Sequence, residues 1–153
     1  LPLAAGCRPS SEGTGEGAAR RPDLSGFRIT IVQTGGIAGV RRTSSVDGAT
    51  LTYTQTNGRI CAEGADCPAA DSLSGPLPER DVRAVERLVA AQWEALMQDY
   101  GRSEGGAHLF EYEVEISYAG RTKHFTPDDL TLPPELGTIR DRLFQAIDSA
   151  RGR

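Results

Sequence analysis

Apolar and polar residues alternate along several short segments of the chain, and a period of two predicts β-strands. The sharpest example is HLFEYEVEISY at residues 108–118, where aromatic and aliphatic side chains alternate with glutamates. This pattern predicts a strand with one buried face and one acidic face. FRITIVQ at 27–33 alternates in the same way, and VRRTSSV at 40–46 does so more weakly. RTKHFT at 121–126 follows a turn at Ala119-Gly120 and is expected to pair with the acidic strand.

A turn signal and a third strand predict an amino-terminal meander. Asp47-Gly48 is typical of a type I′ hairpin turn, in which both central residues take a positive φ. The threonine-rich segment ATLTYTQT at 49–56 follows this turn and places Leu51 on the same face as Tyr53. Residues 27–56 are therefore expected to form a three-stranded antiparallel meander.

Two segments carry apolar residues three and four positions apart, which is the period of an α-helix. The first is PLPERDVRAVERLVAAQWEALMQDYG at 76–101, where Pro78 suits the first turn and Gly101 the end. The second begins at Pro133-Pro134. Residues 57–77, between the meander and the first helix, are expected to form a loop. The predicted core positions of the two helices are Val82, Val85, Val89, Trp93, Leu96, Tyr100, Leu136, Ile139, Leu143 and Ile147.

The order β-β-β-α-β-β-α predicts an α+β fold, an antiparallel sheet with two helices packed on one face. A length of 153 residues suits one domain. The formal net charge of −4 argues against general nucleic-acid binding, which requires a basic surface. No run of about 18 apolar residues is present, so no membrane-spanning helix is expected.

The first residues resemble a bacterial lipobox, in which a leucine and small residues precede the cysteine that receives lipid. In Leu3-Ala4-Ala5-Gly6-Cys7 the leucine stands four residues before the cysteine, and Ala4 holds its usual place. On this interpretation residues 1–7 are the end of a lipoprotein signal peptide, Cys7 is the lipidation site, and residues 8–26 are a flexible tether poor in apolar side chains. The protein would be exported and held at the extracytoplasmic face of the bacterial cell membrane by its lipid alone. The alternative is a chance cysteine near an arbitrary start.

Cys61 and Cys67 remain as a pair within RICAEGADCP. In an exported domain, two nearby cysteines in a loop favour a disulfide. The alternative is a metal site, for which Glu63 and Asp66 are the only further ligands nearby.

The segment TGGIAGVRRT at 34–43 places three glycines in five positions, followed by two arginines. It does not fit a nucleotide-binding loop, because such loops lead into a helix whereas VRRTSSV continues as a strand. Two interpretations stay open. The glycines form a turn or bulge between strands, or they form a wide loop that exposes Ile37 at its tip as a contact surface.

Candidate catalytic residues are few. His108 and His124 would need Asp128 and Asp129 to make a metal site, and solvent-facing positions explain them as well. No G-x-S-x-G motif supports a serine nucleophile. The glutamates of the acidic strand fit a solvated face better than the paired carboxylates of a glycosidase. We therefore expect no enzyme activity, no resident metal and no cofactor.

Three pieces of the chain resemble the emfourin-like family, small protein inhibitors of protealysin and related thermolysin-like metallopeptidases. The pieces are ITIVQTGGIAGVRRT, FEYEVEISYAGRTKHF and PPELGTIRDRL, and the resemblance covers roughly residues 27–148. It implies an α+β domain at 27–153. Two parts depart from the family pattern: the lipobox with its tether, and the cysteine-bearing segment at about 57–77, which resembles an insertion.

The resemblance implies a binding protein that occludes the active site of a thermolysin-type zinc metallopeptidase, and the lipobox-like start adds a lipid anchor. Ile37 and Leu51 would be apolar anchors, Asp47 a carboxylate near the zinc, and Arg41 and Arg42 partners of acidic residues on the protease rim. The alternative is a non-inhibitory envelope lipoprotein with a structural or docking role. An exposed Ile37 favours inhibition, and a buried Ile37 favours docking elsewhere. The candidate contacts are Gly35, Gly36, Ile37, Ala38, Gly39, Arg41, Arg42, Asp47 and Leu51.

Overall fold

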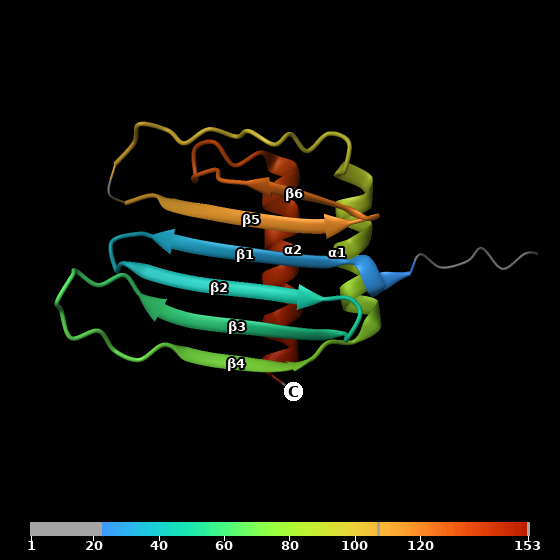
Figure 1. The fold of residues 1–153 in the computed structure, drawn as a ribbon, viewed down its shortest axis with the longest axis horizontal. Coiled ribbons are helices and arrows are strands. Elements are labelled where there is room, and N and C mark those ends of the chain that lie inside the picture. Colours follow the sequence, from blue (N-terminus) through green and yellow to red (C-terminus); the bar gives the residue numbers. More distant parts are fainter. Residues whose placement is uncertain (1–22, 107, 153) are drawn as a thin grey trace, which may run out of the picture.

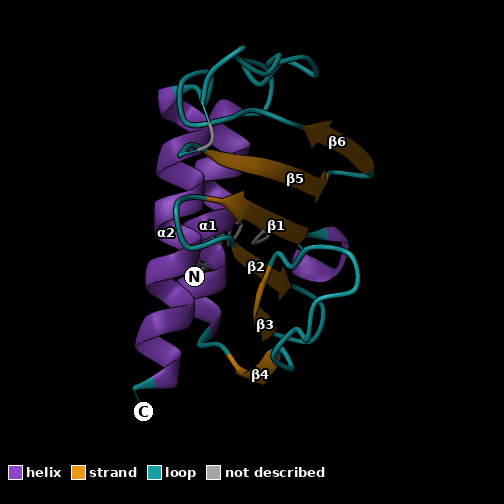
Figure 2. Cartoon of the chain, turned by 90° about the vertical axis from the view of Figure 1, so that its left-hand side faces the viewer, coloured by secondary structure: helices purple, strands orange, loops and turns teal. Residues whose placement is uncertain are grey.

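The β-strands pair into one antiparallel sheet, and two helices cover one of its faces (Figures 1 and 2). The structure is a computed structural model that describes residues 23–106 and 108–152. The strand order across the sheet is β4-β3-β2-β1-β5-β6. The elements are the 3-10 helix η1 Leu24–Gly26, β1 Arg28–Gly35, β2 Val40–Asp47, β3 Thr52–Arg59, β4 Asp71–Pro76, α1 Glu79–Gln92, β5 Phe110–Tyr118, β6 Arg121–Phe125 and α2 Pro134–Arg151.

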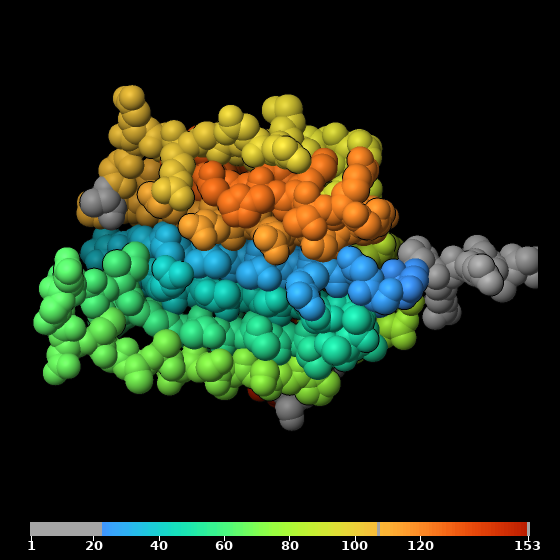
Figure 3. Space-filling model, viewed as in Figure 1, coloured from blue at the N-terminus to red at the C-terminus, as the bar shows by residue number. Residues whose placement is uncertain are grey.

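The two faces of the sheet differ in chemistry because side chains alternate along each strand. Ile29, Ile31 and Ile116 lie on the helix-covered face and are completely buried. The opposite face is polar and is the one seen in Figure 3. Hydroxyl groups pair across its strands, as between Thr30 and Ser45, whose oxygens lie 3.1 Å apart.

Both helices cover the apolar face of the sheet with the apolar stripes that the sequence predicts. α1 also packs against α2. Each helix buries its apolar stripe at exposures of 3% or less, and together with the strands these residues form one continuous core. The buried helix residues include Val82, Val85, Val89, Leu136, Ile139, Leu143 and Ile147.

The predicted fold class is confirmed: an α+β domain with an antiparallel sheet and two helices on one face. One strand was missed. The segment 57–77, expected to be a loop, contains β4 along the edge of the sheet, and β3 continues to Arg59. All residues of β4 except Gly75 are exposed. An edge strand without a buried face has no apolar alternation by which sequence analysis can detect it.

The first helix is shorter than predicted, because α1 ends at Gln92 and not near Gly101. Trp93 and Leu96 continue the buried stripe in a non-helical segment. The Lys123 ammonium on β6 donates hydrogen bonds to the carbonyls of both residues, the second at 2.7 Å. A cation at the carboxyl end of a helix also interacts favourably with the negative end of the helix dipole. Lys123 therefore closes α1 before the apolar pattern stops.

The prediction of a type I′ turn at Asp47-Gly48 is wrong. Gly48 does not have a positive φ, and Leu51 takes the left-handed conformation instead, with a φ of 53°. The turn holds a glycine for lack of space, because a Cβ at Gly48 would lie 2.5 Å from the Leu24 carbonyl oxygen. Asp47 organises the turn by accepting hydrogen bonds from the amides of the next residues, Ala49 and Thr50.

The folded chain begins slightly earlier than residue 27, the predicted start of the domain. Leu24 lies in the core at 6% exposure. Asp23 accepts a hydrogen bond from the Ser25 amide and so caps η1. Residues 23–26 therefore belong to the domain and not to the expected tether. The predicted lipidation site at Cys7 and the segment 1–22 lie outside the described residues.

Lys123→Met should lower the free energy of unfolding by about 1–3 kcal/mol, because two carbonyls at the end of α1 lose their donor and the helix loses a terminal cation. Fluorescence of Trp93, the single tryptophan of the chain, reports urea unfolding next to the substituted residue. Arg87→Met on the exposed surface of α1 is the control, with a change of about 0.5 kcal/mol or less. Equal stabilities of the Lys123 variant and the unaltered protein would contradict this role.

Candidate functional site

Four connecting segments lie together at one end of the sheet (Figure 1). β1 ends at Gly35 opposite Phe110 of β5, and β2 begins at Val40 opposite Arg59 of β3. The connections before and after these positions therefore flank one another. The chain after β6 joins them through a bridge between Asp128 and β5. We call this surface the loop end; it consists of residues 36–39, 60–70, 108–109 and 128–132.

Hydrogen bonds hold the β1–β2 turn from within and from both sides. The Gly39 amide donates to the Gly36 carbonyl at 3.1 Å, which closes the turn. The Gly36 amide donates to the Leu109 carbonyl at 3.2 Å, and the Ile60 amide donates to the Gly39 carbonyl at 2.6 Å. The turn is thus attached to the chain before β5 on one side and to the chain after β3 on the other.

Gly35 explains why the turn begins with glycine. Its φ is +116°, and a Cβ there would lie only 2.4 Å from the Leu109 carbonyl oxygen. Side chains other than hydrogen are excluded by both the conformation and the space. The glycine-rich segment is therefore a close-packed turn between two strands, in agreement with the structural interpretation of its sequence.

The same turn exposes an apolar side chain, as the contact-surface interpretation requires. Ile37 is 87% exposed at the tip of the turn. Ile60, on the neighbouring connection, is 54% exposed, and Leu130 is 68% exposed beside the start of β5. Among the described residues, five large apolar side chains are exposed, and these are three of them. Exposed apolar residues gathered in one region typically mark an interaction surface.

Ile60 and Leu130 were not among the candidates from the sequence. Each is an apolar residue within a polar connecting segment, which is the available signal. That signal does not reveal their position, because the pairing of β2 with β3 and of Asp128 with β5 joins residues far apart in the chain.

The structure separates the nine candidate contacts into two groups. Gly35, the turn residues 36–39, Arg41 and Arg42 lie at or next to the loop end. Asp47 lies at the other end of β2, which at about 3.3 Å per residue is about 23 Å from Val40. A partner that contacts both groups would therefore have to span the length of β2.

Asp47 and Leu51 have structural roles in the β2–β3 turn. The Asp47 carboxylate pairs with Arg28 at 2.5 Å. The hydrogen bond from Arg28, with those from Thr50 and Ala49, lowers the pKa of Asp47, and partial burial opposes this shift. Leu51 is partly buried against the core. These contacts do not place Asp47 beside Ile37 as a zinc ligand, nor Leu51 beside it as an apolar anchor.

Arg42 also differs from expectation. Its guanidinium lies over the Phe144 ring of α2, with a distance of 5.3 Å to the ring centroid. Arg41, the preceding residue, is exposed on the opposite face of the sheet. Strand alternation therefore directs these two arginines to different faces.

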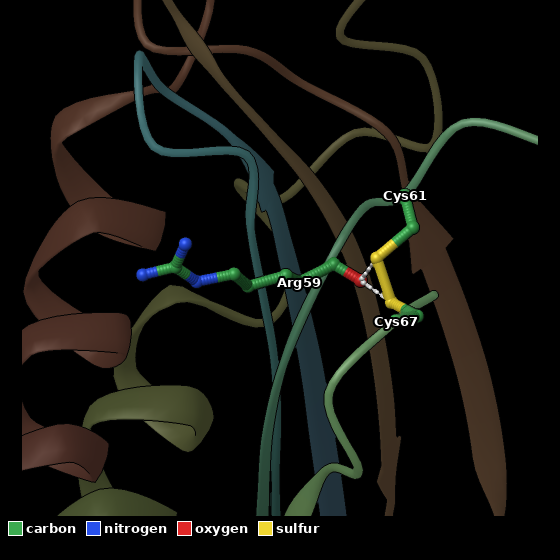
Figure 4. The surroundings of a disulfide bond; sticks show 3 residues. All are labelled: Arg59, Cys61 and Cys67. Carbon is green, nitrogen blue, oxygen red and sulfur yellow. Dashed lines mark hydrogen bonds between the residues drawn. A yellow bond between two sulfur atoms is a disulfide. The ribbon is translucent and has the colours of Figure 1, made fainter. Parts of the chain in front are cut away.

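The disulfide predicted between Cys61 and Cys67 is confirmed (Figure 4). The Arg59 carbonyl oxygen lies 3.9 Å from the sulfur of Cys61 and 3.7 Å from that of Cys67. The bridge closes a short loop at the carboxyl end of β3, directly after Ile60. Because both sulfurs are joined, they do not serve as the pair of metal-binding thiolates considered as the alternative.

Asp128 fixes the segment that carries Leu130. The carboxylate is 3% exposed and accepts hydrogen bonds from the Ser103 hydroxyl and amide, both at 2.6 Å. It also accepts from the amides of Leu130 and Thr131. The Ser103 hydroxyl and these amides hold the pKa of Asp128 well below its usual range, although burial acts in the opposite direction.

The metal site considered at His108, His124, Asp128 and Asp129 does not form. His124 lies opposite Glu115 within the β5–β6 pair, whereas His108 precedes β5. Asp129 accepts hydrogen bonds from the Phe110 amide and the Tyr112 hydroxyl. Within residues 23–106 and 108–152, no group of three or more histidine, cysteine or acidic residues is placed to hold a metal ion.

The acidic strand follows its predicted pattern. Glu111, Glu113 and Glu115 are exposed on the uncovered face of the sheet. Glu111 forms an ion pair with Arg102 at 3.0 Å. These positions agree with a solvated face.

Comparison with models of known protein families gives no match to this chain. Comparison with curated proteins likewise gives no match. None of the described helices is both long and apolar enough to cross a membrane.

Gly35→Ala should lower the free energy of unfolding by about 2 kcal/mol or more, because alanine meets both the unfavourable φ and the Leu109 carbonyl. Urea unfolding measures the change. Gly101→Ala is the matched control, because a Cβ at Gly101 meets no atom within 4 Å, and we expect a change of about 0.5 kcal/mol or less. If both variants were as stable as the unaltered protein, the close-packed turn would be disproved.

Asp128→Asn should destabilise the protein at neutral pH, and the loss should shrink in acid. The folded pKa of Asp128 lies below its unfolded value of about 3.9. The carboxylate therefore stabilises the fold fully above that unfolded value, and its contribution disappears as the pH falls through the folded pKa. Urea midpoints at pH 7 and at about pH 3 test this expectation. Exposed Asp99→Asn is the control, and a pH-independent loss in the Asp128 variant would contradict the assignment.

Proposed function

We propose that this protein is a binding protein that blocks a thermolysin-like zinc metallopeptidase by placing its loop end in the active-site cleft. The observation that carries the proposal is Ile37, which is 87% exposed at the tip of a turn held by hydrogen bonds on both sides. An apolar side chain in that position is exposed to water, which is unfavourable, and it contributes nothing to the core. A partner that buries it removes this cost.

The resemblance to emfourin-like inhibitors supports the class of partner. Peptidases of the thermolysin class favour a large apolar side chain just past the scissile bond, and Ile37 suits that pocket. Ile60 lies on the adjacent connection and extends the apolar contact.

The backbone of the turn offers a group for the catalytic zinc. A catalytic zinc keeps one coordination position open for water or substrate. The carbonyl oxygens of Ile37 and Ala38 accept no backbone hydrogen bond in the described part of the chain, unlike those of Gly36 and Gly39. A carbonyl at the tip therefore replaces Asp47 as the candidate zinc-facing group.

The frame around the turn explains how a bound loop resists productive cleavage. The turn is joined to β1 and β2, and its flanks bond to Leu109 and Ile60. Both sides of a cut bond would remain held in the sheet. A turn fixed before binding also loses little conformational freedom on association, which favours affinity.

Export and lipid anchoring at Cys7 remain part of the proposal. They are supported by the lipobox-like sequence and by the Cys61–Cys67 disulfide, since disulfides persist mainly in oxidising compartments. In this proposal the domain acts at the outer face of the bacterial membrane.

Ile37→Asp should strongly weaken inhibition, because a charge would replace the apolar anchor in a dry pocket. The measurement is a titration of a thermolysin-like peptidase, with a fluorogenic peptide substrate, by the full chain. We expect stoichiometric loss of activity with the unaltered protein. The variant should be weaker by about 30-fold or more, which corresponds to about 2 kcal/mol.

Met97→Asp is the matched control. Met97 is 64% exposed, but it follows α1 and lies outside the loop end. Equal weakening by both substitutions would show that the loop end is not the contact. Absence of inhibition by the intact unaltered chain would exclude this protease class and favour the docking role of an envelope lipoprotein. Rapid digestion of the chain would show that it is a substrate.

A further inference from the structure

The arginines of the described residues divide into two groups. Most form ion pairs with carboxylates, for example Arg28 with Asp47 and Arg102 with Glu111. In the described part of the chain, four make no such pair, and three of these four lie on the β2–β3 ladder next to the loop end. The four are Arg41, Arg42, Arg59 and Arg87.

Two of these arginines lie side by side on the same face. Arg42 pairs with Asn57 across the ladder, and Arg59 is two residues beyond Asn57 on the same strand. Such diagonal neighbours lie roughly 7–8 Å apart. Arg42 extends over α2 at Phe144. Figure 4 shows the Arg59 side chain directed toward the helices as well. We call Arg42 and Arg59 the arginine pair.

Carboxylates on the neighbouring elements β4 and α2 form no ion pair with Arg42 or Arg59. Asp71, opposite Asn57 on β4, forms no ion pair with Arg59. On α2, Asp141 pairs with Arg140, and Asp148 pairs with Arg151. Within the described residues, neither guanidinium of the arginine pair therefore forms an ion pair with a carboxylate.

We propose that the arginine pair, next to the loop end, recognises an acidic segment of the partner, in which two carboxylates at positions i and i+2 of an extended chain bind Arg42 and Arg59. Alternate residues of an extended chain are about 6.6–6.8 Å apart on one face, which matches the diagonal spacing of Arg42 and Arg59. Guanidinium groups bind carboxylates through two parallel hydrogen bonds. The inference rests on the proposed function for the place of contact, and it adds the chemistry of the partner's rim.

Fluorescence anisotropy of a labelled peptide tests the proposal with the full chain. The probe is fluorescein-Gly-Ser-Asp-Leu-Asp-Ser-Gly-amide, and its control carries asparagines in place of both aspartates. We expect the acidic peptide to bind and to lose affinity between about 20 mM and about 300 mM NaCl, because salt screens exposed charges. The asparagine peptide should bind at least tenfold more weakly.

The double variant Arg42→Gln with Arg59→Gln should reduce affinity for the acidic peptide by tenfold or more. Arg87→Gln is the matched control, because Arg87 is also an exposed arginine without an ion pair but lies on α1. The double variant Arg42→Lys with Arg59→Lys keeps the charges and should retain an intermediate, salt-sensitive affinity. Equal binding of the two peptides, no binding of the acidic peptide at about 1 mM in low salt, or an equal loss in Arg87→Gln would overturn the proposal.

Titration of the peptidase separates this inference from the proposed function. If the unaltered chain inhibits and the glutamine double variant inhibits equally well, the arginine pair is not used and the inhibitory function stands. If the acidic peptide binds through the arginine pair but the peptidase is not inhibited, the recognition of acidic segments stands and the proposed function fails.

Discussion

Burial of one face of the sheet is the constraint on which the rest of this structure depends. Apolar side chains on the helix-facing side of the central strands, such as Ile29, Ile31 and Ile116, are completely buried under α1 and α2. A slip of one residue in the pairing of these strands would exchange the apolar face for the polar face, so the core fixes the register of the central strands. Register in turn fixes which turns and connections meet at each end. The loop end is therefore a consequence of core packing, although none of its tips belongs to the core.

The sequence predicted those parts of the fold that bury apolar side chains. FEYEVEISY alternates because β5 has one dry face and one wet face, and the stripe from Leu136 to Ile147 is apolar because α2 rests on the sheet. β4 could not be predicted in this way, because its position depends on backbone pairing with β3. The end of α1 depends on Lys123, which lies 30 residues from Trp93 in the chain and carries no local helix signal.

The candidate site was predictable only in its local part. The glycines and Ile37 are neighbours in sequence, so the turn and its exposed tip were foreseen. Asp47 and Leu51 were grouped with them because they share the meander, but β2 separates them along its full length. Arg59 and Ile60 join the turn through a long-range pairing that no short motif contains. Local motifs therefore identified the tip, and tertiary pairing supplied its surroundings.

The position of the amino-terminal side of the domain determines how the loop end is presented. Leu24 packs beside Gly48, at the opposite end of the sheet from the β1–β2 turn. β1 runs from one end to the other over eight residues, about 23 Å at the rise of an extended chain. Whatever is attached ahead of Asp23, whether a natural anchor, a fusion partner or a sensor chip, therefore joins the domain at its rear. The loop end lies at the opposite end of the sheet from Asp23, so a partner bound there would not meet this point of attachment.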